Sequence, residues 1–349
     1  MGKTKGNTAD FEKGLLHPEN SLEDDKRDTA LRPRNLHEFI GQRAMKENLS
    51  VFIEAAKARK ESLDHLFLTG PPGLGKTTLA QIVAHELGSE FKVTSAPVLD
   101  KPKDLAGILT TVTEKTVFFI DEIHRLKPAL EEMLYIAMED YELDWIIGQG
   151  PSARTIRIPI QPFTLVGATT KAGNVSSPLI SRFGISCRFS FYDEKDMEAI
   201  VLRSAGILRI SIEDHAASLL ARSARGTPRV VNRLLRRVRD FAQINGCTSI
   251  SREIVEEALK KLEVDTLGLE LLDREILKII IERYRGGPVG AETLAISIGE
   301  SVDTLEDYYE PYLIQAGLLQ RTPRGRMVTA LAFKHLGLAQ PDSDGGLLF

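Results

Sequence analysis

The clearest chemical pattern in the sequence is the run GPPGLGKTT at positions 70–78. Its glycines allow backbone conformations that other residues avoid, so consecutive N–H groups can turn inward around phosphate oxygens. Lys76 is expected to reach the β and γ phosphates of a nucleotide, and the hydroxyl of Thr77 is expected to bind Mg²⁺. This pattern predicts a phosphate-binding P-loop, and a simple turn rich in Gly and Pro is the alternative. The residues predicted to bind nucleotide here are Gly73, Gly75, Lys76, Thr77 and Thr78.

Two acidic residues, Asp121 and Glu122, follow the apolar run TVFFI. Ligands of open α/β sheets bind at the carboxyl ends of the strands, where this pair would lie. Asp121 is expected to hold Mg²⁺, directly or through water, and Glu122 to orient and partly deprotonate an attacking water. Acidic pairs after a strand can also be a solvated turn, so it is their combination with the P-loop that predicts hydrolysis. His124 is expected to be a surface or helix-capping residue without a chemical role.

A third apolar run, 163–168, ends in Thr169 and Thr170 at the same edge. One of these hydroxyls is predicted to sense the γ phosphate, although threonines are also good strand formers, and Thr170 is our catalytic candidate. Arg182, in SRFG, carries a permanent planar charge that could neutralise charge on a transferred phosphoryl group. A surface arginine in a polar turn is the alternative for Arg182.

The spacing of apolar residues predicts the elements that would position these groups. From 31 to 193, helical patterns alternate with the buried-strand patterns LDHLFLTG, KTVFFIDE and QPFTLVGATT, which predicts an α/β core with parallel strands. Apolar residues recur at helical spacing from 194 to 264, which predicts a small all-helical domain. Residues 265–339 carry helices followed by a short basic hairpin, which is typical of a winged helix. Residues 1–30 and 340–349 are expected to be tails.

The composition fits several domains of an enzyme without a membrane anchor. The chain has 349 residues, 42% apolar and 27% charged, and its net charge of -4 argues against a uniformly basic nucleic-acid coat. Cys187 and Cys247 form no CxxC pair, so no metal site or disulfide framework is predicted. Because no apolar leader or 18-residue apolar run occurs, we expect neither secretion nor a membrane span, and a cytoplasmic location.

A helix is predicted to start at Gly226-Thr227-Pro228-Arg229, with Pro228 in its first turn and Thr227 as its cap. Arg229 can then face the nucleotide. The predicted buried stripe is Val230, Val231, Leu234, Leu235, Val238 and Phe241. The opposite, largely solvated face would carry Arg233, Arg236, Arg237 and Asp240.

Two further segments are candidate contact surfaces. The stretch from about 143 to 159 predicts an inserted β-hairpin whose Trp145, Ile146 and Ile147 either dock a partner or, for Trp145, pack on the core. The helix pattern SVDTLEDYYEPYLIQAG carries several acids that repel phosphate, and Pro311 would kink or divide it, so it should not read bases. The basic residues Arg321, Arg324 and Arg326 instead flank a tight turn, which predicts sequence-independent, salt-dependent binding to DNA phosphates.

The ordered set GPPGLGKT, FFIDEIH, LVGATT, SRFG and GTPR resembles the AAA+ ATPases and, more narrowly, the RuvB family of Holliday junction branch-migration motors. The resemblance runs from about residue 31 to 338 and includes LRPRNLHEFIGQ and EPYLIQAGLLQRTPRGR. It implies an AAA+ core with a helical lid and a winged helix. It also implies an ATP- and Mg²⁺-dependent motor in recombination and repair, built as a homohexamer in which Arg182 completes the ATP site of the next subunit.

The resemblance implies further site residues and partners. The hairpin residues Ile146 and Ile147 would bind RuvA, Arg321 and Arg326 would contact duplex DNA at Holliday junctions, and the RuvC resolvase would join the complex. The additional residues implied to contact nucleotide are Leu31, Arg32, Glu139, Asp140, Tyr141, Tyr192 and Arg229.

Two rival functions share parts of this pattern. A clamp-loader-type AAA+ ATPase would use hydrolysis as a switch, but the expected collar domain is absent and the inserted hairpin and basic wing favour a motor. A non-hydrolysing, nucleotide-gated DNA-binding scaffold would not need Glu122. Turnover by the Glu122 variant separates this second rival from a hydrolase.

Overall fold

The computed structural model describes the backbone of residues 29–147 and 154–340, and the side chains of the same residues except 29, 146 and 147. Its described residues form two compact units. The P-loop unit is Arg32–Tyr192, and the second unit begins at Asp193 and also includes Leu31. None of the described helices is long and apolar enough to cross a membrane.

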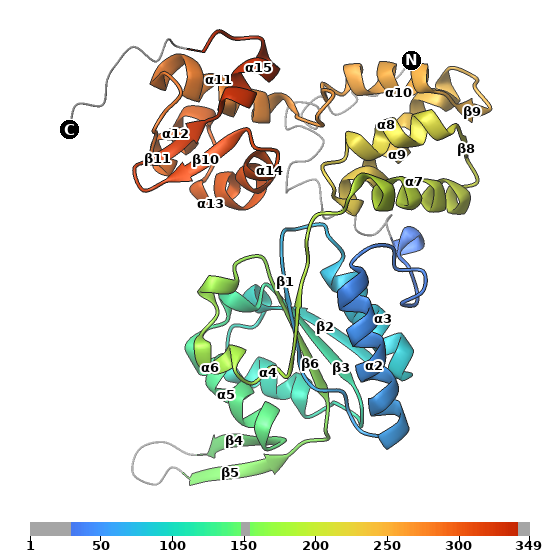
Figure 1. Cartoon of the computed structure of the whole chain (residues 1–349). Helices are drawn as coiled ribbons and strands as arrows, with labels where there is room; N and C mark the ends of the chain where they lie inside the picture. The colour runs from blue at the N-terminus through green and yellow to red at the C-terminus, as the bar shows by residue number, and fades with distance from the viewer. Residues whose placement is uncertain (1–28, 148–153, 341–349) are drawn as a thin grey trace, which may run out of the picture. The chain divides into compact units, whose positions relative to one another are not determined.

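The P-loop unit is built on one five-stranded parallel sheet with the strand order β2-β3-β6-β1-β7 (Figure 1). The strands are β1 (Leu66–Thr69), β2 (Phe91–Ser95), β3 (Val117–Asp121), β6 (Thr164–Thr169) and β7 (Ile185–Arg188). The sequence predicted β1, β3 and β6 but not β2 or β7. Both missed strands lie at the edges of the sheet, and neither carries the continuous apolar run of a strand buried on both faces.

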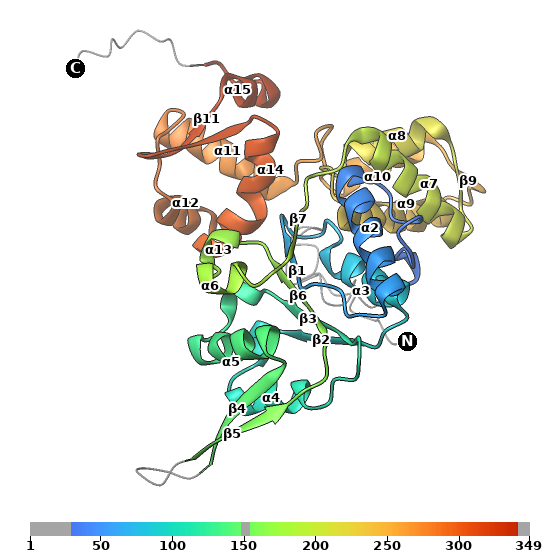
Figure 2. The same ribbon diagram turned by 60° about the horizontal axis from the view of Figure 1, so that its bottom comes forward.

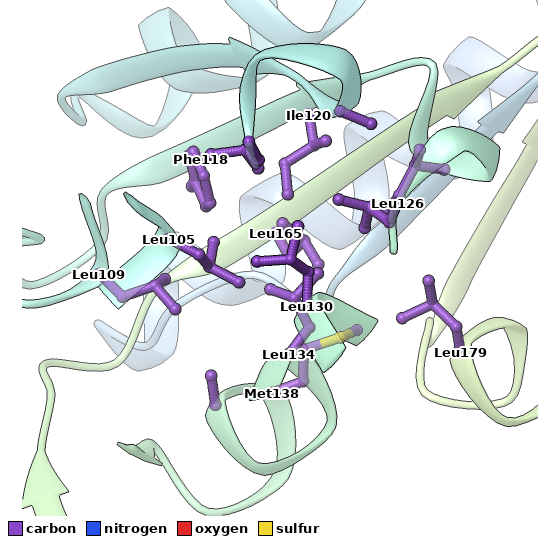
Figure 3. Close-up of a cluster of buried hydrophobic side chains, with 14 of the residues drawn as sticks. Leu105, Leu109, Phe118, Ile120, Leu126, Leu130, Leu134, Met138, Leu165 and Leu179 are labelled. Carbon is purple, nitrogen blue, oxygen red and sulfur yellow. The ribbon is translucent and has the colours of Figure 1, made fainter. Parts of the chain in front are cut away.

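Helices cover both faces of this sheet, as Figures 1 and 2 show. One face carries α2 (Arg43–Arg59) and α3 (Lys76–Leu87), and the other carries α4 (Pro102–Leu109) and α5 (Pro128–Glu139). Figure 3 shows the core on the second face, where side chains of β3 and β6 meet those of α4 and α5. Its labelled members include Leu105, Leu109, Phe118, Ile120, Leu130, Leu134, Met138 and Leu165. This packing holds the strands rigidly, and with them the residues at their ends.

The hairpin expected near DWIIGQGPSARTIRI corresponds to the antiparallel strands β4 (Glu142–Ile147) and β5 (Arg154–Pro159). The half-buried Trp145 packs against the core between the sheet and α5. The side chains of Ile146 and Ile147 and the Gly-rich turn predicted over 148–153 lie outside the described residues. The contact of Trp145 with the core confirms the prediction that this residue packs on the core.

The first part of the second unit is a small helical domain. It contains α7 (Glu194–Leu208), α8 (Asp214–Arg222), α9 (Pro228–Ile244) and α10 (Arg252–Lys261). It also contains a parallel pair of two-residue strands, β8 (Ser211–Ile212) and β9 (Ser249–Ile250), which are too short to leave a pattern in the sequence.

Three expectations for α9 were wrong in detail. Arg233 is only 4% exposed rather than solvated, because its face of the helix is covered from within the unit, where its charge acts on Tyr308. Val230 and Phe241 are half-buried, so the buried stripe is narrower than predicted. Thr227 stands at the N-cap, but its hydroxyl donates to the carbonyl of Arg225, 3.2 Å away, and makes no capping bond.

The second part of this unit has helices and a terminal hairpin. Its helices are α11 (Leu271–Tyr284), α12 (Ala291–Ile298), α13 (Val302–Thr304), the π-helical turn Leu305–Tyr309, α14 (Glu310–Gln315) and α15 (Ala330–Leu336). The strands β10 (Leu319–Thr322) and β11 (Gly325–Val328) form the antiparallel hairpin. The backbone stays helical from 302 to 315, so Pro311 does not break the acidic helix; the structure shows instead a change from the π-helical turn to α14, with Pro311 in the first turn of α14.

A buried charge cluster joins the two parts of this unit. Arg225, just after α8, pairs with Asp273 on α11, and its Nε donates to the carbonyl of Gly268 at 2.6 Å. The guanidinium also lies over the ring of Tyr312, with 5.1 Å to the centroid. Burial opposes the charge of Arg225, but the carboxylates of Asp273 and Glu270 outweigh it and raise the pKa of the guanidinium. Burial raises the pKa of Asp273, and the neighbouring Arg225 opposes that rise.

Candidate active site

The P-loop joins the end of β1 to the start of α3 and requires glycine at particular positions. Gly70, Gly73 and Gly75 have φ values of 141°, 77° and 103°, in the region that other residues avoid. A Cβ on Gly70 would also lie 2.7 Å from the carbonyl oxygen of Phe189. The predicted conformational role of these glycines is confirmed.

Lys76 is the first residue of α3 and is only 8% exposed. Its Nζ donates to the carbonyl oxygens of Gly70 and Pro71 at 2.7 and 2.9 Å, which places the ammonium group within the curve of the loop. Thr77 and Thr78 follow in the first turn of the helix, where backbone N–H groups have no intrahelical partner. A 12-residue helix that begins here favours an anion at its N-terminus.

Asp121 ends β3, on the strand adjacent to β6, and its Oδ1 accepts a hydrogen bond from the backbone N–H of Glu122 at 3.0 Å. Glu122 has a φ of 51°, a left-handed conformation that side chains rarely adopt and that is typical of functional turns. The hydroxyl of Thr77 and the carboxylate of Asp121 are hard oxygen donors. Such groups, together with nucleotide phosphates, suit Mg²⁺, which commonly binds through one or two carboxylates.

His124 contradicts the expectation of a surface or helix-capping residue. Its Nδ1 lies 2.8 Å from Oγ1 of Thr169 and 3.2 Å from Oε2 of Glu122, and its side chain is only 10% exposed. The contact joins positions 45 residues apart, so local sequence patterns could not reveal it. The only signal was a titratable side chain two residues after a candidate base.

The two threonines after β6 differ in their surroundings. Thr169 is fully buried, and its Oγ1 meets His124 and accepts a hydrogen bond from the backbone N–H of Lys171 at 2.9 Å. Thr170 is half-buried, and its hydroxyl lies 3.5 Å from Oε2 of Glu122. This geometry favours Thr170 as the group that meets substrate, because the hydroxyl of Thr169 is used inside the protein.

Arg182 is held by several groups. Its Nε lies 3.2 Å from Oε1 of Glu139, Nη2 donates to Oε2 of the same carboxylate at 3.2 Å, and Nη1 donates to the carbonyl of Pro178 at 2.7 Å. The guanidinium also lies 4.5 Å from the centroid of the Tyr135 ring. Such a fork of contacts fixes the direction of the arginine.

Arg182 lies at the amino-terminal ends of the parallel strands, whereas the P-loop lies at their carboxyl-terminal ends. It precedes β7, whose first residue Ile185 pairs with Leu66 at the start of β1, whereas the loop begins after Thr69 at the end of β1. The intervening strand is about 10 Å long at roughly 3.3 Å per residue. Arg182 and the P-loop of the same chain are therefore separated by the length of the sheet.

The predicted nucleotide-binding stretch 139–141 lies at the same end of the strands as Arg182. Glu139 ends α5 and is the partner of Arg182, and Asp140 caps the end of the helix. Tyr141 has a φ of 53°, packs edge-on against Phe163, and has its pKa raised by burial. The structure thus brings together two sets of residues that the sequence had implicated separately.

The remaining predicted nucleotide contacts are divided between the two units. The hydroxyl of Tyr192 donates to the carbonyl of Leu74 at 3.1 Å, and a Cβ on Gly75 would lie 3.2 Å from the ring of Phe39. These aromatic rings therefore flank the P-loop, and nothing in the sequence singled out Phe39. Arg32 begins the P-loop unit, while Leu31 and Arg229 belong to the second unit, so their nucleotide contacts stay predictions.

The predicted basic wing is partly neutralised. The fully buried carboxylate of Glu310 accepts hydrogen bonds from Nε of Arg321 at 2.6 Å and from Nε of Arg326 at 2.7 Å. Arg326 also pairs with Glu306, and its side chain is only 13% exposed, against 48% for Arg321. Arg324 is exposed at the turn and makes no ion pair with any residue that the structure describes. Glu306 and Glu310 belong to the helix whose acids were predicted to repel phosphate, and they instead bind the side chains of Arg321 and Arg326.

Family models match the chain along nearly its whole length. They are the Holliday junction DNA helicase RuvB P-loop domain at residues 31–189, the RuvB AAA lid domain at 192–265 and the RuvB C-terminal winged helix domain at 266–337. The Holliday junction branch migration complex subunit RuvB of Treponema denticola is 71% identical over 337 residues, 97% of each protein. The protein of the same name from Borrelia garinii subsp. bavariensis is 57% identical over 320 residues, 92% of each.

A solved structure of the Thermotoga maritima RuvB Holliday junction branch migration motor is similar to this fold, with a TM-score of 0.84 at 52% identity. The match covers 90% of this chain and 100% of that chain. The α/β P-loop core, the AAA lid and the winged helix expected from the sequence are thereby confirmed. The chain belongs to the RuvB family of Holliday junction DNA helicases, which are P-loop AAA+ ATPases.

Proposed function

We propose that this protein is an ATP-driven motor that moves the branch point of Holliday junctions along duplex DNA during recombination and repair. The observation that carries the proposal is the separation of Arg182 and Glu139 from the P-loop by the length of the central sheet. A motor built from such subunits needs a neighbour to complete each site, and hydrolysis is then coupled to movement between subunits.

Hydrolysis would be carried out by residues at the carboxyl edge of the sheet. Lys76 and the N-terminus of α3 bind the phosphates, and Glu122 orients and partly deprotonates the attacking water. Thr170 contacts the γ phosphate from the end of β6. Mg²⁺, held by Thr77 and Asp121, would neutralise charge on the β and γ phosphates.

The split site implies a head-to-tail assembly of subunits, which we infer closes into a ring of six. Arg182 of one subunit would reach the γ phosphate bound by the next, with Glu139, Asp140 and Tyr141 at the same face. Leu31, Arg32, Tyr192 and Arg229 would contact the nucleotide within its own subunit. Movement of the lid with nucleotide state then moves the winged helix.

The partners are duplex DNA and the other proteins of the junction complex. The β10–β11 hairpin would contact phosphates through Arg324 and the half-exposed Arg321, with Arg326 anchored behind them. Binding through phosphates alone is independent of sequence and weakens steeply with salt. We assign RuvA to the β4–β5 hairpin, and RuvC to the assembled complex.

The function is tested by ATP-dependent dissociation of a synthetic four-way junction, with and without RuvA. We expect dissociation with ATP that RuvA accelerates, and none when ATP is replaced by a non-hydrolysable analogue. Equal dissociation with the analogue would contradict a motor and favour a nucleotide-gated binding protein. Hydrolysis without dissociation, even in the presence of RuvA, would favour a clamp-loader-type switch.

Replacing Ile146 and Ile147 with serine is expected to abolish stimulation of ATPase activity by RuvA while basal activity stays within about twofold, because both lie on the hairpin strand β4 away from the P-loop. Phosphate release with increasing RuvA measures the effect. The matched control is Thr155→Ser on the paired strand β5, which should respond normally. Undiminished stimulation of the double variant would remove the hairpin from the RuvA interface.

A further inference from the structure

We propose that His124 is a positioning residue that holds the carboxylate of Glu122 in place for ATP hydrolysis. The inference rests on the proposed role of Glu122 as the group that orients water. Nδ1 of His124 lies 3.2 Å from Oε2 of Glu122 and 2.8 Å from Oγ1 of Thr169. Since the imidazole is nearly enclosed, with 10% of its side chain exposed, water cannot readily replace these contacts.

The partners of Nδ1 determine which nitrogen carries the proton. An ionised carboxylate only accepts hydrogen bonds, so a bare Nδ1 beside Glu122 would place two acceptors against each other. Nδ1 therefore carries hydrogen, which it donates to Oγ1 of Thr169 at 2.8 Å, and its polar edge lies 3.2 Å from the carboxylate oxygen of Glu122. The hydroxyl oxygen of Thr169 can accept this bond in addition to the one from the N–H of Lys171, because it has two lone pairs.

The turn that carries His124 is itself fixed to β6. Glu122 is in the left-handed region, and its carbonyl accepts a hydrogen bond from the N–H of Arg125 at 2.8 Å. The side chain of Ile123 is fully buried against Gly167 of β6, where an added Cβ would lie 2.6 Å from its Cδ1. The same strand thus positions Glu122 through Ile123 and His124, and carries Thr170 at its end.

This arrangement has a mechanistic consequence. The hydroxyl of Thr170 lies 3.5 Å from Oε2 of Glu122, and Nδ1 of His124, in the turn Ile123–Arg125, lies 3.2 Å from the same oxygen. A displacement of β6 on contact with the γ phosphate would move the imidazole, and with it the carboxylate. His124 thus links Glu122, the residue proposed to activate water, to Thr169, the neighbour of the proposed phosphate-detecting Thr170.

The test compares His124→Ala with His124→Asn in the full-length protein. The alanine variant is expected to lose about tenfold to a hundredfold in kcat, because it removes the polar ring nitrogen that lies beside the charged carboxylate of Glu122, while the KM for ATP and the Kd for ADP change less than about twofold. The side-chain nitrogen of asparagine occupies nearly the place of Nδ1, so His124→Asn should recover most of the lost turnover. His85→Asn, at an exposed position on α3, is the matched control and should resemble wild type.

Three results would overturn the proposal. They are a kcat of His124→Ala within twofold of wild type, an asparagine variant as impaired as the alanine variant, and a loss of nucleotide affinity equal to the loss of kcat. A failure of the underlying role of Glu122 has a different signature, because Glu122→Gln would then hydrolyse ATP at the wild-type rate.

Discussion

Replacing Glu122 with glutamine is expected to lower ATP turnover about a hundredfold to ten-thousandfold while nucleotide still binds. The amide keeps the shape of the side chain but cannot take a proton from water, and Glu122 has no part in the phosphate-binding loop. Steady-state phosphate release measures turnover, and titration with a fluorescent ADP analogue measures binding. The loss should appear in kcat, because the contact with water matters in the transition state.

The matched control for this experiment is Glu114→Gln, which makes the same change at an exposed loop position of the same unit. It should hydrolyse ATP at the wild-type rate. Wild-type turnover by Glu122→Gln would mean that the base lies elsewhere. Absence of turnover in the wild-type protein, also with DNA and RuvA present, would support the nucleotide-gated scaffold instead.

Replacing Asp273 with alanine is expected to destabilise the second unit by about 3–5 kcal/mol, because Arg225 stays charged and would remain buried without its main partner. Asp273 is fully buried and also accepts a hydrogen bond from the backbone N–H of Glu270 at 2.8 Å, which the alanine variant loses as well. Such a loss corresponds to a decrease of roughly 10 °C in the Tm of a domain of this size.

Two probes separate the units in the full-length chain. The single tryptophan, Trp145, lies in the P-loop unit, so its fluorescence reports on that unit, whereas far-UV circular dichroism follows the helices of both. Only the dichroism transition should shift. The matched control is Glu256→Ala, which breaks the exposed pair with Arg252 and should change stability by less than about 1 kcal/mol. Equal effects of the two variants would contradict a structural role for the buried pair.

Local patterns were sufficient for the elements that carry the chemistry. The P-loop glycines, the acids after β3 and the threonines after β6 follow from residue types at the ends of buried strands, since parallel strands end at a common edge. Pro311 likewise indicated the irregularity in this helix, which is the change from the π-helical turn to α14, because proline lacks the N–H that a regular helix interior uses. The inserted hairpin followed from the apolar residues Trp145, Ile146 and Ile147 before a Gly-rich segment.

The features that the sequence did not reveal depend on contacts between distant segments. His124 was expected at the surface because only the fold brings it to Thr169. Arg233 was placed in solvent because helical periodicity cannot show that a polar face is covered by another part of the unit. The pairing of Glu310 with Arg321 and Arg326 similarly joins a helix to a hairpin, and it changes which arginines can face DNA.

Arg182 of one subunit is proposed to complete the ATP site of another, and mixing two inactive variants tests this shared site. Lys76→Ala removes the phosphate-binding ammonium but keeps Arg182, and Arg182→Ala does the reverse. Each alone should lose about a thousandfold or more in turnover. Random co-assembly at equal concentrations should restore about one quarter of the sites, because half of the P-loops are intact and half of their neighbours supply the arginine.

Co-assembly of either variant with a Lys76→Ala/Arg182→Ala double variant is the control, and it should stay inactive. Phosphate release by the Lys76→Ala and Arg182→Ala mixture is expected to rise well above the sum of the two separate proteins. A mixture no more active than that sum, with mixed assembly verified by differently tagged subunits, would contradict a site shared between subunits.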